Sequence, residues 1–508
     1  YYRQYKMRVL QITLLFFMTF VTYSKKNIIF IAVDDLKPSI GAYGDEFART
    51  PNIDELASLG ATFTNSHVQQ AICAPSRVSL LTGLRPDLTE VWDLETLMRD
   101  KNPSILTLPQ HFKNNGYKTV GMGKIFDNRS VDKGLDKISW SIPYIRINVN
   151  HKVHGNSITG FQSPENKKIL SDIREKAVAD GIPNQGMWQY LRSKYKPSTE
   201  SFDISDEGYF DGAMTVKAVD QINKLSEDKK PFFLAVGFQK PHLPFVAPKK
   251  YWEMYNRNEI QLAKYQKWAR GTVKLVYNNN GEMRSYTDIP DSFDQNGLIN
   301  TEKQRELIHG YYACVSYIDA QIGKIINAIK ENNLLENTII VLWGDHGWHL
   351  GDHGQWAKHS NFEQATRSPL IIVDPDSKKD IVNSSPTESV DIFPTLTELT
   401  KIDAPDNLQG VSLVPLLNGK SKKVKNFAVS QYPRGRVMGY AIRDDRYRYV
   451  AWYKDRDFLK EKDIIIKELY DYKNDPEETV NIVGLQRDLS EEFQIKLNEF
   501  LDKQSLEK

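Results

Sequence analysis

Two pairs of potential metal ligands lie far apart in this sequence, and each closely follows an apolar run. Asp34-Asp35 comes directly after Asn27–Val33, and Asp345-His346 follows Thr338–Trp343 with one glycine between them. Three carboxylates at the ends of two strands indicate a hard divalent cation with oxygen ligands, most simply Ca²⁺. Zinc fits less well, because the group holds one imidazole and no thiolate. For Asp34-Asp35 alone, a helix cap or a turn is the alternative.

The chain has two cysteines, and they stand in different contexts. Cys73 precedes Ala74-Pro75-Ser76-Arg77 at the start of a predicted helix that ends before Gly83. The free N–H groups and partial positive charge of a helix N-terminus suit an anion. Cys314 lies inside a long helical pattern and is predicted to be a small buried hydrophobic residue. A disulfide between the two cysteines is the alternative.

These side chains need a scaffold that brings strand ends together. Strands are predicted at Asn27–Val33, Thr119–Gly121, Pro231–Val236, Thr338–Trp343 and Pro369–Val373. Helices are predicted at Pro51–Leu59, Pro75–Thr82, Leu108–Asn114, Tyr209–Leu225, Thr301–Lys330 and Ser389–Leu399. Their alternation predicts an α/β fold with a large mixed, mostly parallel sheet sandwiched by helices. Ligands of such sheets collect beyond the carboxyl ends of the strands, where the polar residues fall.

The pattern changes after about residue 424. Short antiparallel strands are predicted at Phe427–Gln431, Gly439–Arg443 and Tyr447–Tyr453, and an amphipathic helix at Arg487–Asp502. We therefore predict a catalytic domain at 25–423 and a smaller α+β C-terminal domain at 424–508 with an antiparallel sheet. Residues 130–205 and 250–300 lack clear periodicity, so we predict long insertions that shape a substrate pocket.

Charge and the N-terminal residues restrict the class of protein. The 508 residues carry a formal net charge of +2, which argues against nucleic acid as a partner. Residues 1–24 are predicted to be a signal peptide with six upstream residues, because basic Met7-Arg8 precedes the apolar run Val9–Val21. That run is too short for a comfortable bilayer span, so an exported, periplasmic or extracellular protein without stable membrane insertion is expected. A buried first strand or helix is the alternative.

The Cys73 motif, with Leu81-Thr82-Gly83 after it, resembles the Cys-x-Pro-Ser-Arg motif of type I sulfatases, in the alkaline phosphatase superfamily. Segments similar to the iduronate-2-sulfatase branch are Val33–Leu36, Phe232–Phe245, Trp343–Lys358, Ser389–Leu396 and Met438–Tyr449. The resemblance implies the sulfatase fold, and it implies that a maturation enzyme oxidises Cys73 to formylglycine (3-oxoalanine). The calcium ligands that it implies are Asp34, Asp35, modified Cys73, Asp345 and His346.

A formylglycine hydrate solves a problem of covalent catalysis. A serine nucleophile would leave a sulfate ester that must itself be hydrolysed, whereas the second hydroxyl of a hydrate can lose its proton and expel sulfate. The resemblance further implies that Arg77 and Lys124 hold the hydrate and the sulfate. It places His242 and Lys358 near the leaving-group oxygen, and we predict His242 as the general acid with Lys358 assisting.

One departure from the family pattern concerns the release step. The family has a histidine shortly after the lysine that matches Lys124, whereas this chain continues Ile125-Phe126-Asp127-Asn128. Asp127 could replace that base, or the role could be lost or moved to another residue such as His151 or His154. Candidate sugar-binding residues, for which structural roles are the alternative, are Trp348, His349, His353 and Arg434.

The leading prediction is an exported sulfatase that hydrolyses sulfate monoesters of a sulfated carbohydrate. The similarity to the iduronate-2-sulfatase branch suggests a polysaccharide that contains uronic acids. A composition rich in Lys, Asn and Ile is typical of a bacterium, so an algal polysaccharide such as ulvan is favoured. A glycosaminoglycan uronate-2-sulfatase and a phosphodiesterase or phosphonate monoester hydrolase are the enzymatic alternatives. A non-catalytic protein that binds sulfated glycans is a third alternative, suggested by the missing histidine. Fold alone does not decide among substrates.

Overall fold

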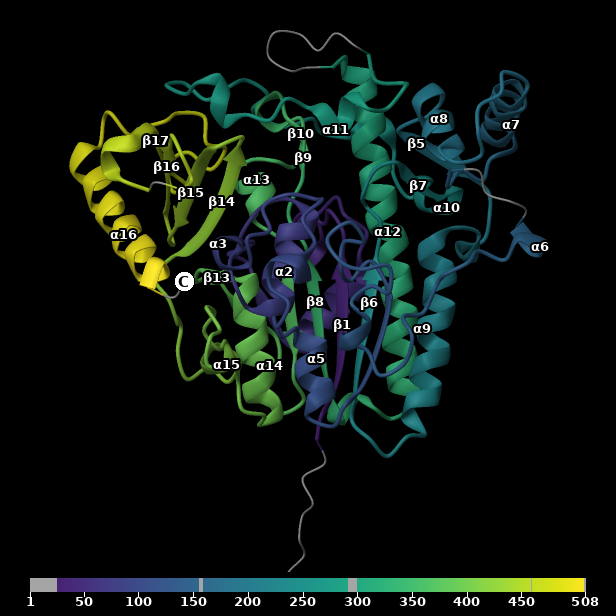
Figure 1. Ribbon diagram of the computed structural model, residues 1–508, viewed down its shortest axis with the longest axis horizontal. Helices are drawn as coiled ribbons and strands as arrows, with labels where there is room; N and C mark the ends of the chain where they lie inside the picture. Colours follow the sequence, from purple (N-terminus) through teal and green to yellow (C-terminus); the bar gives the residue numbers. More distant parts are fainter. Residues whose placement is uncertain (1–24, 155–158, 291–298, 458, 507–508) are drawn as a thin grey trace, which may run out of the picture.

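The computed structural model describes residues 25–154, 159–290, 299–457 and 459–506 (Figure 1). At its centre is a seven-stranded sheet in the order β12-β2-β11-β8-β1-β6-β4. The central strand, β1 (Asn27–Val33), pairs in parallel with β6 (Phe232–Phe238) on one side and β8 (Thr338–Gly344) on the other. All residues of these three strands are buried, as their continuous apolar runs predict for a parallel sheet covered on both faces.

The outer strands make the sheet mixed. On one side β4 (Lys118–Gly123) runs parallel to β6. On the other side β11 (Leu370–Val373) is antiparallel to both β8 and β2 (Ala61–Phe63), and β12 (Ile381–Asn383) is parallel to β2. The predicted fold class is therefore confirmed.

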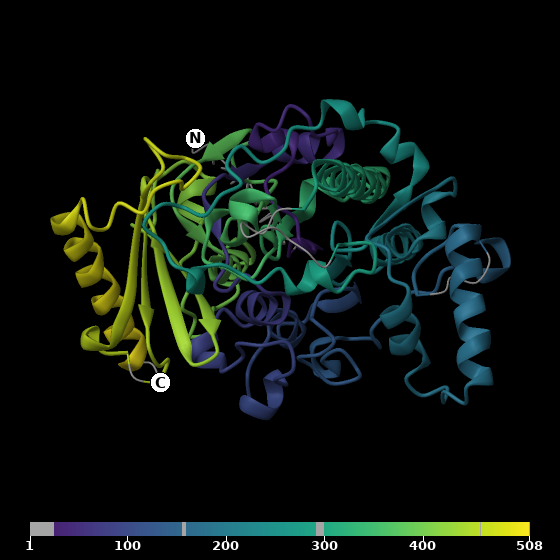
Figure 2. The same cartoon turned by 90° about the horizontal axis from the view of Figure 1, so that it is seen from above.

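Alternate residues of β1 pack into two separate hydrophobic cores, because successive side chains of a strand point to opposite faces of the sheet. Ile29 and Ile31 pack in the core under α1 (Pro51–Ser58), α9 (Phe210–Ser226) and α12 (Thr301–Glu331). Ile28 and Phe30 pack in the core under α2 (Cys73–Thr82), α5 (Leu108–Asn114) and α14 (Ile392–Thr400). Figure 2 shows the sheet enclosed between these two helical layers.

The helix that carries the cysteine begins earlier than predicted. Its first residue is Cys73 rather than Pro75, since Ile72 is extended and the N–H of Ser76 donates to the Ile72 carbonyl at 3.1 Å. A proline in the first turn is tolerated because the first N–H groups of a helix have no partner within it. The helix ends before Gly83, whose φ of 68° is a left-handed conformation that glycine adopts at little cost.

Both predicted insertions contain helices that the sequence pattern did not reveal. Residues 130–205 hold α7 (Pro164–Ala179), α8 (Met187–Lys194) and β5 (Thr199–Phe202), which pairs with β7 (Phe245–Pro248). The sixteen-residue helix α7 buries only Leu170 and Ala177, so its apolar stripe is too narrow to give a strong periodic signal. Residues 250–300 include α11 (Gly281–Arg284).

The C-terminal part is a four-stranded antiparallel sheet with one covering helix. Its strands are β14 (Ala428–Arg434), β15 (Val437–Arg443), β16 (Tyr447–Tyr453) and β17 (Ile464–Asp471), and its helix is α16 (Arg487–Leu506). Strand β17 was not predicted. Tyr449 packs against Phe493 of α16. The boundary at residue 424 stays a prediction.

The remaining elements are short, and most lie in the connections. The helices are α3 (Pro86–Thr89), α4 (Met98–Lys101), α6 (His151–His154), α10 (Lys249–Trp252), α13 (Glu363–Thr366) and α15 (Val414–Leu417). The strands are β3 (Ser66–His67), β9 (His349–Leu350), β10 (Trp356–Ala357) and β13 (Thr387–Glu388). Within the described ranges, none of the helices has the length and apolar character needed to cross a bilayer. The predicted signal peptide lies outside the described residues.

Candidate active site

Cys73 is the first residue of α2 and points into a buried cluster at the carboxyl edge of the sheet. Its Sγ atom lies 3.5 Å from Asp34 Oδ1, 3.5 Å from His346 Nε2 and 3.4 Å from Lys124 Nζ. These partners come from three different strand ends. Cys314 is not a member of this cluster and donates to the Val246 carbonyl at 3.6 Å. Both cysteines are free thiols, so the alternative of a disulfide between them is wrong.

The carboxylates meet because β1 and β8 are neighbouring parallel strands that end at the same edge. The backbone N–H of Asp35 donates to Asp345 Oδ1 at 2.9 Å. His346 Nε2 lies 3.4 Å from Asp35 Oδ1 and 3.6 Å from Asp345 Oδ1. Asp35 itself has a φ of 62°, a left-handed conformation that aspartate tolerates better than most residues. The predicted ligands from the two strand ends thus lie together.

The donor set and its charges fit a hard divalent cation. Ligand atoms of Asp34, Cys73, Asp345 and His346 all lie within 4.8 Å of one another. Burial and then the neighbouring carboxylates raise the pKa of Asp35 well above its ordinary range. Burial likewise raises the pKa of Asp345 to about 7, despite the opposing charge of Arg77. A cation between these carboxylates would favour their ionised forms, and Ca²⁺ suits their oxygen ligands.

Arg77 lies one helical turn after Cys73 and is completely buried. Its Nε donates to Asp345 Oδ2 at 2.9 Å, and its Nη2 donates to Asp34 Oδ1 at 3.2 Å. Its Nη1 donates to the backbone carbonyls of Lys124 and Ile125. The guanidinium therefore neutralises carboxylates from two strand ends and fixes the turn after β4.

Lys124 extends from that turn to Cys73. Its Nζ lies 2.5 Å from Asp34 Oδ2 and 3.4 Å from Cys73 Sγ. Asp127, the suggested replacement base, lies 3.9 Å from this ammonium and accepts two hydrogen bonds of 2.8 Å from Arg129. Burial alone would raise the pKa of Asp127, but Arg129 and Lys124 lower it to about 2. This carboxylate is therefore a weak base at neutral pH.

His242 and Lys358 share two carboxylate neighbours, Asp35 and Glu282. Lys358 Nζ lies 2.9 Å from Asp35 Oδ1, and 4.9 Å from the centre of the Trp348 ring beneath it. His242 Nδ1 pairs with the Leu243 carbonyl at 2.6 Å, which requires a proton on Nδ1. Its Nε2 then faces Glu282. Burial and the charge of Lys358 lower the pKa of His242 to about 3.

Glu282 is a member of this cluster that the sequence did not reveal. It lies on the short helix α11 of an insertion, and Oε1 is 3.3 Å from His242 Nε2 and 3.2 Å from Lys358 Nζ. Oε2 accepts from His359 Nε2 at 3.0 Å. A lone acidic residue in a segment without periodicity gives no local signal, because its partners come from distant parts of the chain.

Comparison with known proteins decides the family. The Sulfatase family model matches residues 26–402, and the model of the N-sulphoglucosamine sulphohydrolase C-terminal region matches residues 351–506. Human iduronate 2-sulfatase is 33% identical over 89% of this chain and 90% of its own length. A sulfatase from Formosa agariphila is 32% identical over 90% of this chain and 83% of its own. This chain belongs to the sulfatase family.

Solved structures share the fold of this sulfatase. One solved protein, in complex with its substrate D-glucosamine-2-N,6-O-disulfate, has a TM-score of 0.66 at 22% identity. The match covers 95% of this chain and 98% of that one. A phosphonate monoester hydrolase from Silicibacter pomeroyi has a TM-score of 0.69 at 19% identity, covering 94% and 95%. Family membership makes the protein a sulfuric ester hydrolase, and sulfatases use formylglycine and calcium.

Three of the four suggested sugar-binding residues of the sulfatase are buried, and Arg434 is partly exposed. Trp348 and His349 are completely buried, and His353 is 2% exposed and stacked on Phe362. Arg434 donates to the carbonyls of Leu275 and His359. Trp348 instead packs behind Lys358 and His242, and the other three bind neighbouring parts of the fold. Their polar, aromatic sequence resembled a binding surface because burial cannot be read from residue type.

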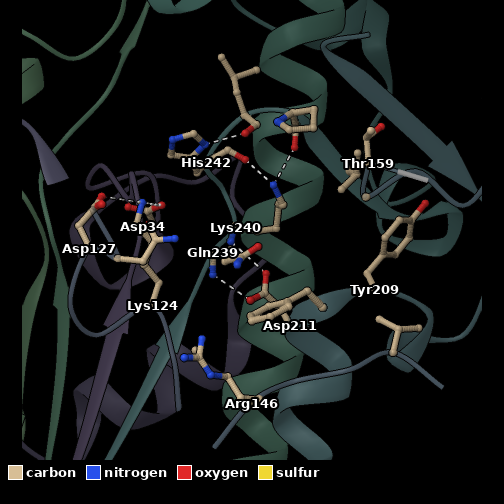
Figure 3. A pocket seen from close by; sticks show the side chains of 18 of the residues that line it. Asp34, Lys124, Asp127, Arg146, Thr159, Tyr209, Asp211, Gln239, Lys240 and His242 are labelled. Carbon is tan, nitrogen blue, oxygen red and sulfur yellow. Dashed lines mark hydrogen bonds and ion pairs between the residues drawn. The ribbon is translucent and has the colours of Figure 1, made fainter. Parts of the chain in front are cut away.

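A pocket of about 810 Å³ in the sulfatase reaches Asp34 and Lys124, the neighbours of Cys73 (Figure 3). Asp34, Lys124 and His242 line its inner end. Its outer walls come from the 130–205 insertion, in agreement with the expectation that this segment shapes a pocket. His151 and His154 lie on α6 and are not among the residues that line it. The suggestion that one of them supplies the missing base therefore has no support from the lining of this pocket.

Proposed function

We propose that this sulfatase removes sulfate from a sulfated carbohydrate, using a formylglycine made from Cys73 and a calcium ion. The observation that carries the proposal is the Cys73 side chain itself. It lies at a helix start, 3.5 Å from both Asp34 and His346, in a buried group of potential metal ligands. That position suits a nucleophile which shares a cation with two strand ends.

The chain's own residues would divide the work as follows. Asp34, Asp35, Asp345, His346 and the modified Cys73 would hold calcium. The hydrate would supply the nucleophilic hydroxyl, and the ion would add positive charge beside the sulfate. Lys124 stands between Asp34 and the nucleophile, so its ammonium can bind a sulfate oxygen. Arg77 is fully enclosed, so its role is to position the carboxylates and the hydrate.

His242 is assigned as the general acid for the leaving oxygen, with Lys358 beside it. The cation of Lys358 opposes protonation of His242, whereas Glu282 at 3.3 Å favours it. A bound sulfate would add negative charge near the ring and so raise the pKa of His242. Glu282 also accepts from His359, and this second contact fixes the carboxylate that orients His242 and Lys358.

Two substrate classes remain, and both contain uronic acids. The 33% identity to human iduronate 2-sulfatase supports a sulfated polysaccharide with uronate residues. Ulvan and a glycosaminoglycan are the two candidates. Export fits an extracellular polysaccharide, and sequencing the N-terminus of secreted protein would test it by revealing cleavage near residue 24.

Sulfate release from defined oligosaccharides tests the proposal. Protein expressed with a formylglycine-generating enzyme should release sulfate and should show the mass of 3-oxoalanine at position 73. Cys73→Ser should abolish release, whereas Cys314→Ser, which alters the other buried thiol, should keep most of it. A strong preference for a phosphate diester would favour the phosphodiesterase alternative. Complete inactivity of matured protein on every sulfated oligosaccharide would favour the binding protein.

A further inference from the structure

The outer part of the pocket carries positive charge that the chain itself does not neutralise. Five cationic side chains line the pocket against three carboxylates. The cations are Lys124, Arg129, Arg146, Arg192 and Lys240, and the carboxylates are Asp34, Asp127 and Asp211. What the pocket can bind depends on which of these side chains already have a partner of opposite charge.

The three carboxylates are all engaged. Asp34 lies between Arg77 and Lys124, and Asp127 is bound by Arg129. Asp211 accepts the backbone N–H groups of Gln239 and Lys240 at 2.8 and 3.0 Å. Among the cations, Lys240 is committed to the carbonyls of His242 and Pro244. Two guanidinium groups remain without a carboxylate in the described part of the chain: Arg146 and Arg192.

Both of these arginines are held in place by uncharged partners. Nη2 of Arg146 donates to the Lys133 carbonyl at 2.5 Å. Figure 3 shows Arg146 at the side of the pocket opposite His242. Arg192 lies 4.4 Å above the ring of Trp188, four residues earlier on α8, a spacing that places both on one helix face. Trp188 is 54% exposed although it lines the pocket.

Such fixed, unneutralised guanidinium groups are suited to anions. Arginine binds carboxylate and sulfate-like groups through its planar fork of donors, and an arginine already held by other contacts loses less entropy on binding. An exposed tryptophan on the same wall offers an apolar surface to a sugar ring. The pocket volume lies in the range of sites that enclose small ligands, so it has room for sugar beyond the sulfate itself.

We propose that Arg146 and Arg192, with Trp188 holding Arg192, form a second anion subsite. It takes a carboxylate or a second sulfate on a sugar next to the one that loses its sulfate. This inference rests on the proposed function and deepens it: the preferred substrate is an acidic oligosaccharide that bears at least one anion besides the scissile sulfate.

Binding and turnover test the subsite separately. Cys73→Ser protein, which cannot turn over, is titrated calorimetrically with a sulfated, uronate-containing disaccharide and with the same compound after reduction of its carboxylate. A disulfated disaccharide without uronate forms the third arm and distinguishes carboxylate from sulfate. Arg146→Gln and Arg192→Gln should each weaken binding of the ligand that bears the second anion about tenfold, in line with the loss of one charge-assisted hydrogen bond. Arg174→Gln, on the exposed face of α7, is the control and should bind as the parent does.

Turnover by matured enzyme completes the test. Both variants should raise KM for the acidic disaccharide about tenfold while kcat stays within about twofold, and neither should affect the reduced compound. Arg192→Lys should recover only part of the affinity, because lysine keeps the charge without the fork. Equal binding of all ligands by parent and variants, in protein that releases sulfate, would overturn the subsite and leave the proposed function intact. Absence of sulfate release by the parent would instead count against the function.

Discussion

At the scale of single residues, the three buried carboxyl groups of the site differ in the direction in which the protein shifts their pKa. Burial opposes ionisation of Asp34, yet Lys124, His242 and Arg77 together hold the pKa of this carboxyl well below its ordinary value. Asp35 and Asp345 have raised pKa values, because burial and the other carboxylates outweigh their cationic neighbours. The chain therefore satisfies one carboxylate by itself and leaves two that calcium would stabilise.

Arg77 should not tolerate replacement by lysine. Its planar group contacts Asp34, Asp345 and two backbone carbonyls from one buried position, and an ammonium cannot reach all of them. Arg77→Lys should lower the free energy of unfolding by about 3 kcal/mol, the usual cost of breaking a buried ion pair. It should also reduce kcat/KM for sulfate release at least a hundredfold. Urea unfolding and steady-state kinetics measure the two effects, and wild-type stability in this variant would contradict the assigned role.

Glu282 should matter for turnover more than for folding. Glu282→Gln keeps the shape of the side chain but removes the charge that faces His242 and Lys358. The expected result is a fall in kcat of about tenfold to a hundredfold with a small change in KM, because His242, the proposed general acid, loses a group that favours its protonation. Glu259→Gln, in an exposed position of the same insertion, is the control. A change confined to KM would show that Glu282 acts on binding instead.

What the sequence could predict at this scale follows from local order along the chain. Asp34, Asp345 and Cys73 follow apolar strands or begin a helix, so their meeting point could be inferred from sheet topology. Glu282 could not be inferred, because an insertion folds back over the site to bring it there. The burial of His349 and His353 could not be inferred either, since the neighbours that enclose them come from other elements.

At the scale of elements, long apolar segments were predicted well and weakly patterned ones were missed. The predicted limits of β1, α5 and β16 agree with the structure. Strand β17 was missed because its apolar run, Ile464–Ile466, is short and is followed by a lysine and a glutamate. Helix α7 was missed because it is almost wholly solvated.

Packing of α12 against the turn that carries His242 depends on Gly310. A Cβ atom at this position would lie 2.8 Å from Phe245 Cβ and 2.8 Å from the Trp252 ring. Alanine is favoured over glycine within a helix by about 1 kcal/mol, so propensity alone predicts that Gly310→Ala is stabilising. We expect the opposite sign, with a loss of about 1–3 kcal/mol from overpacking. Thermal unfolding decides, and a raised Tm would contradict the packing argument.

Asp206, which directly follows the 130–205 insertion, forms an ion pair with Lys324 of α12. We expect this contact to make the stability of the fold depend on pH in the acidic range. Asp206 lies 2.7 Å from Lys250 Nζ and 2.8 Å from Lys324 Nζ. Burial raises its pKa, but these lysines and Gln321 outweigh burial and lower it to about 2, below its ordinary value of 3.8. A lowered pKa in the folded state stabilises the protein above pH 4, and this contribution is lost as the pH falls towards 2.

Asp206→Asn should therefore lower Tm at pH 7 and flatten the decline of Tm between pH 4 and pH 2. Asp203→Asn, three residues earlier, is the control and should follow the parent curve. Parallel curves for Asp206→Asn and the parent across this range would show that the ion pairs contribute no pH-dependent stability.

At the scale of the whole molecule, the C-terminal sheet shares a core with the rest of the chain. Trp452 and Tyr470 of this sheet pack in one cluster with Tyr277 and Phe362. A backbone hydrogen bond also joins the two parts: the Gln431 N–H donates to the Gln69 carbonyl at 2.7 Å. Figure 1 shows this sheet standing beside the central one rather than apart from it. The C-terminal part is thus a packed subdomain, and its loss would expose apolar surface of both parts.

Calcium should stabilise the whole fold, because the proposed ligands lie at the ends of β1 and β8 and at the start of α2. An ion bound only by the folded chain adds about 2.7 kcal/mol at a hundredfold excess over its Kd. We expect a chelator to lower Tm by several degrees and calcium to restore it, as measured by differential scanning calorimetry. Asp345→Ala should remove this response, whereas Asp172→Ala on the solvated helix α7 should retain it. If calcium does not change the Tm of the parent protein, Arg77 and Lys124 already neutralise the carboxylates. That result would contradict the proposed calcium site.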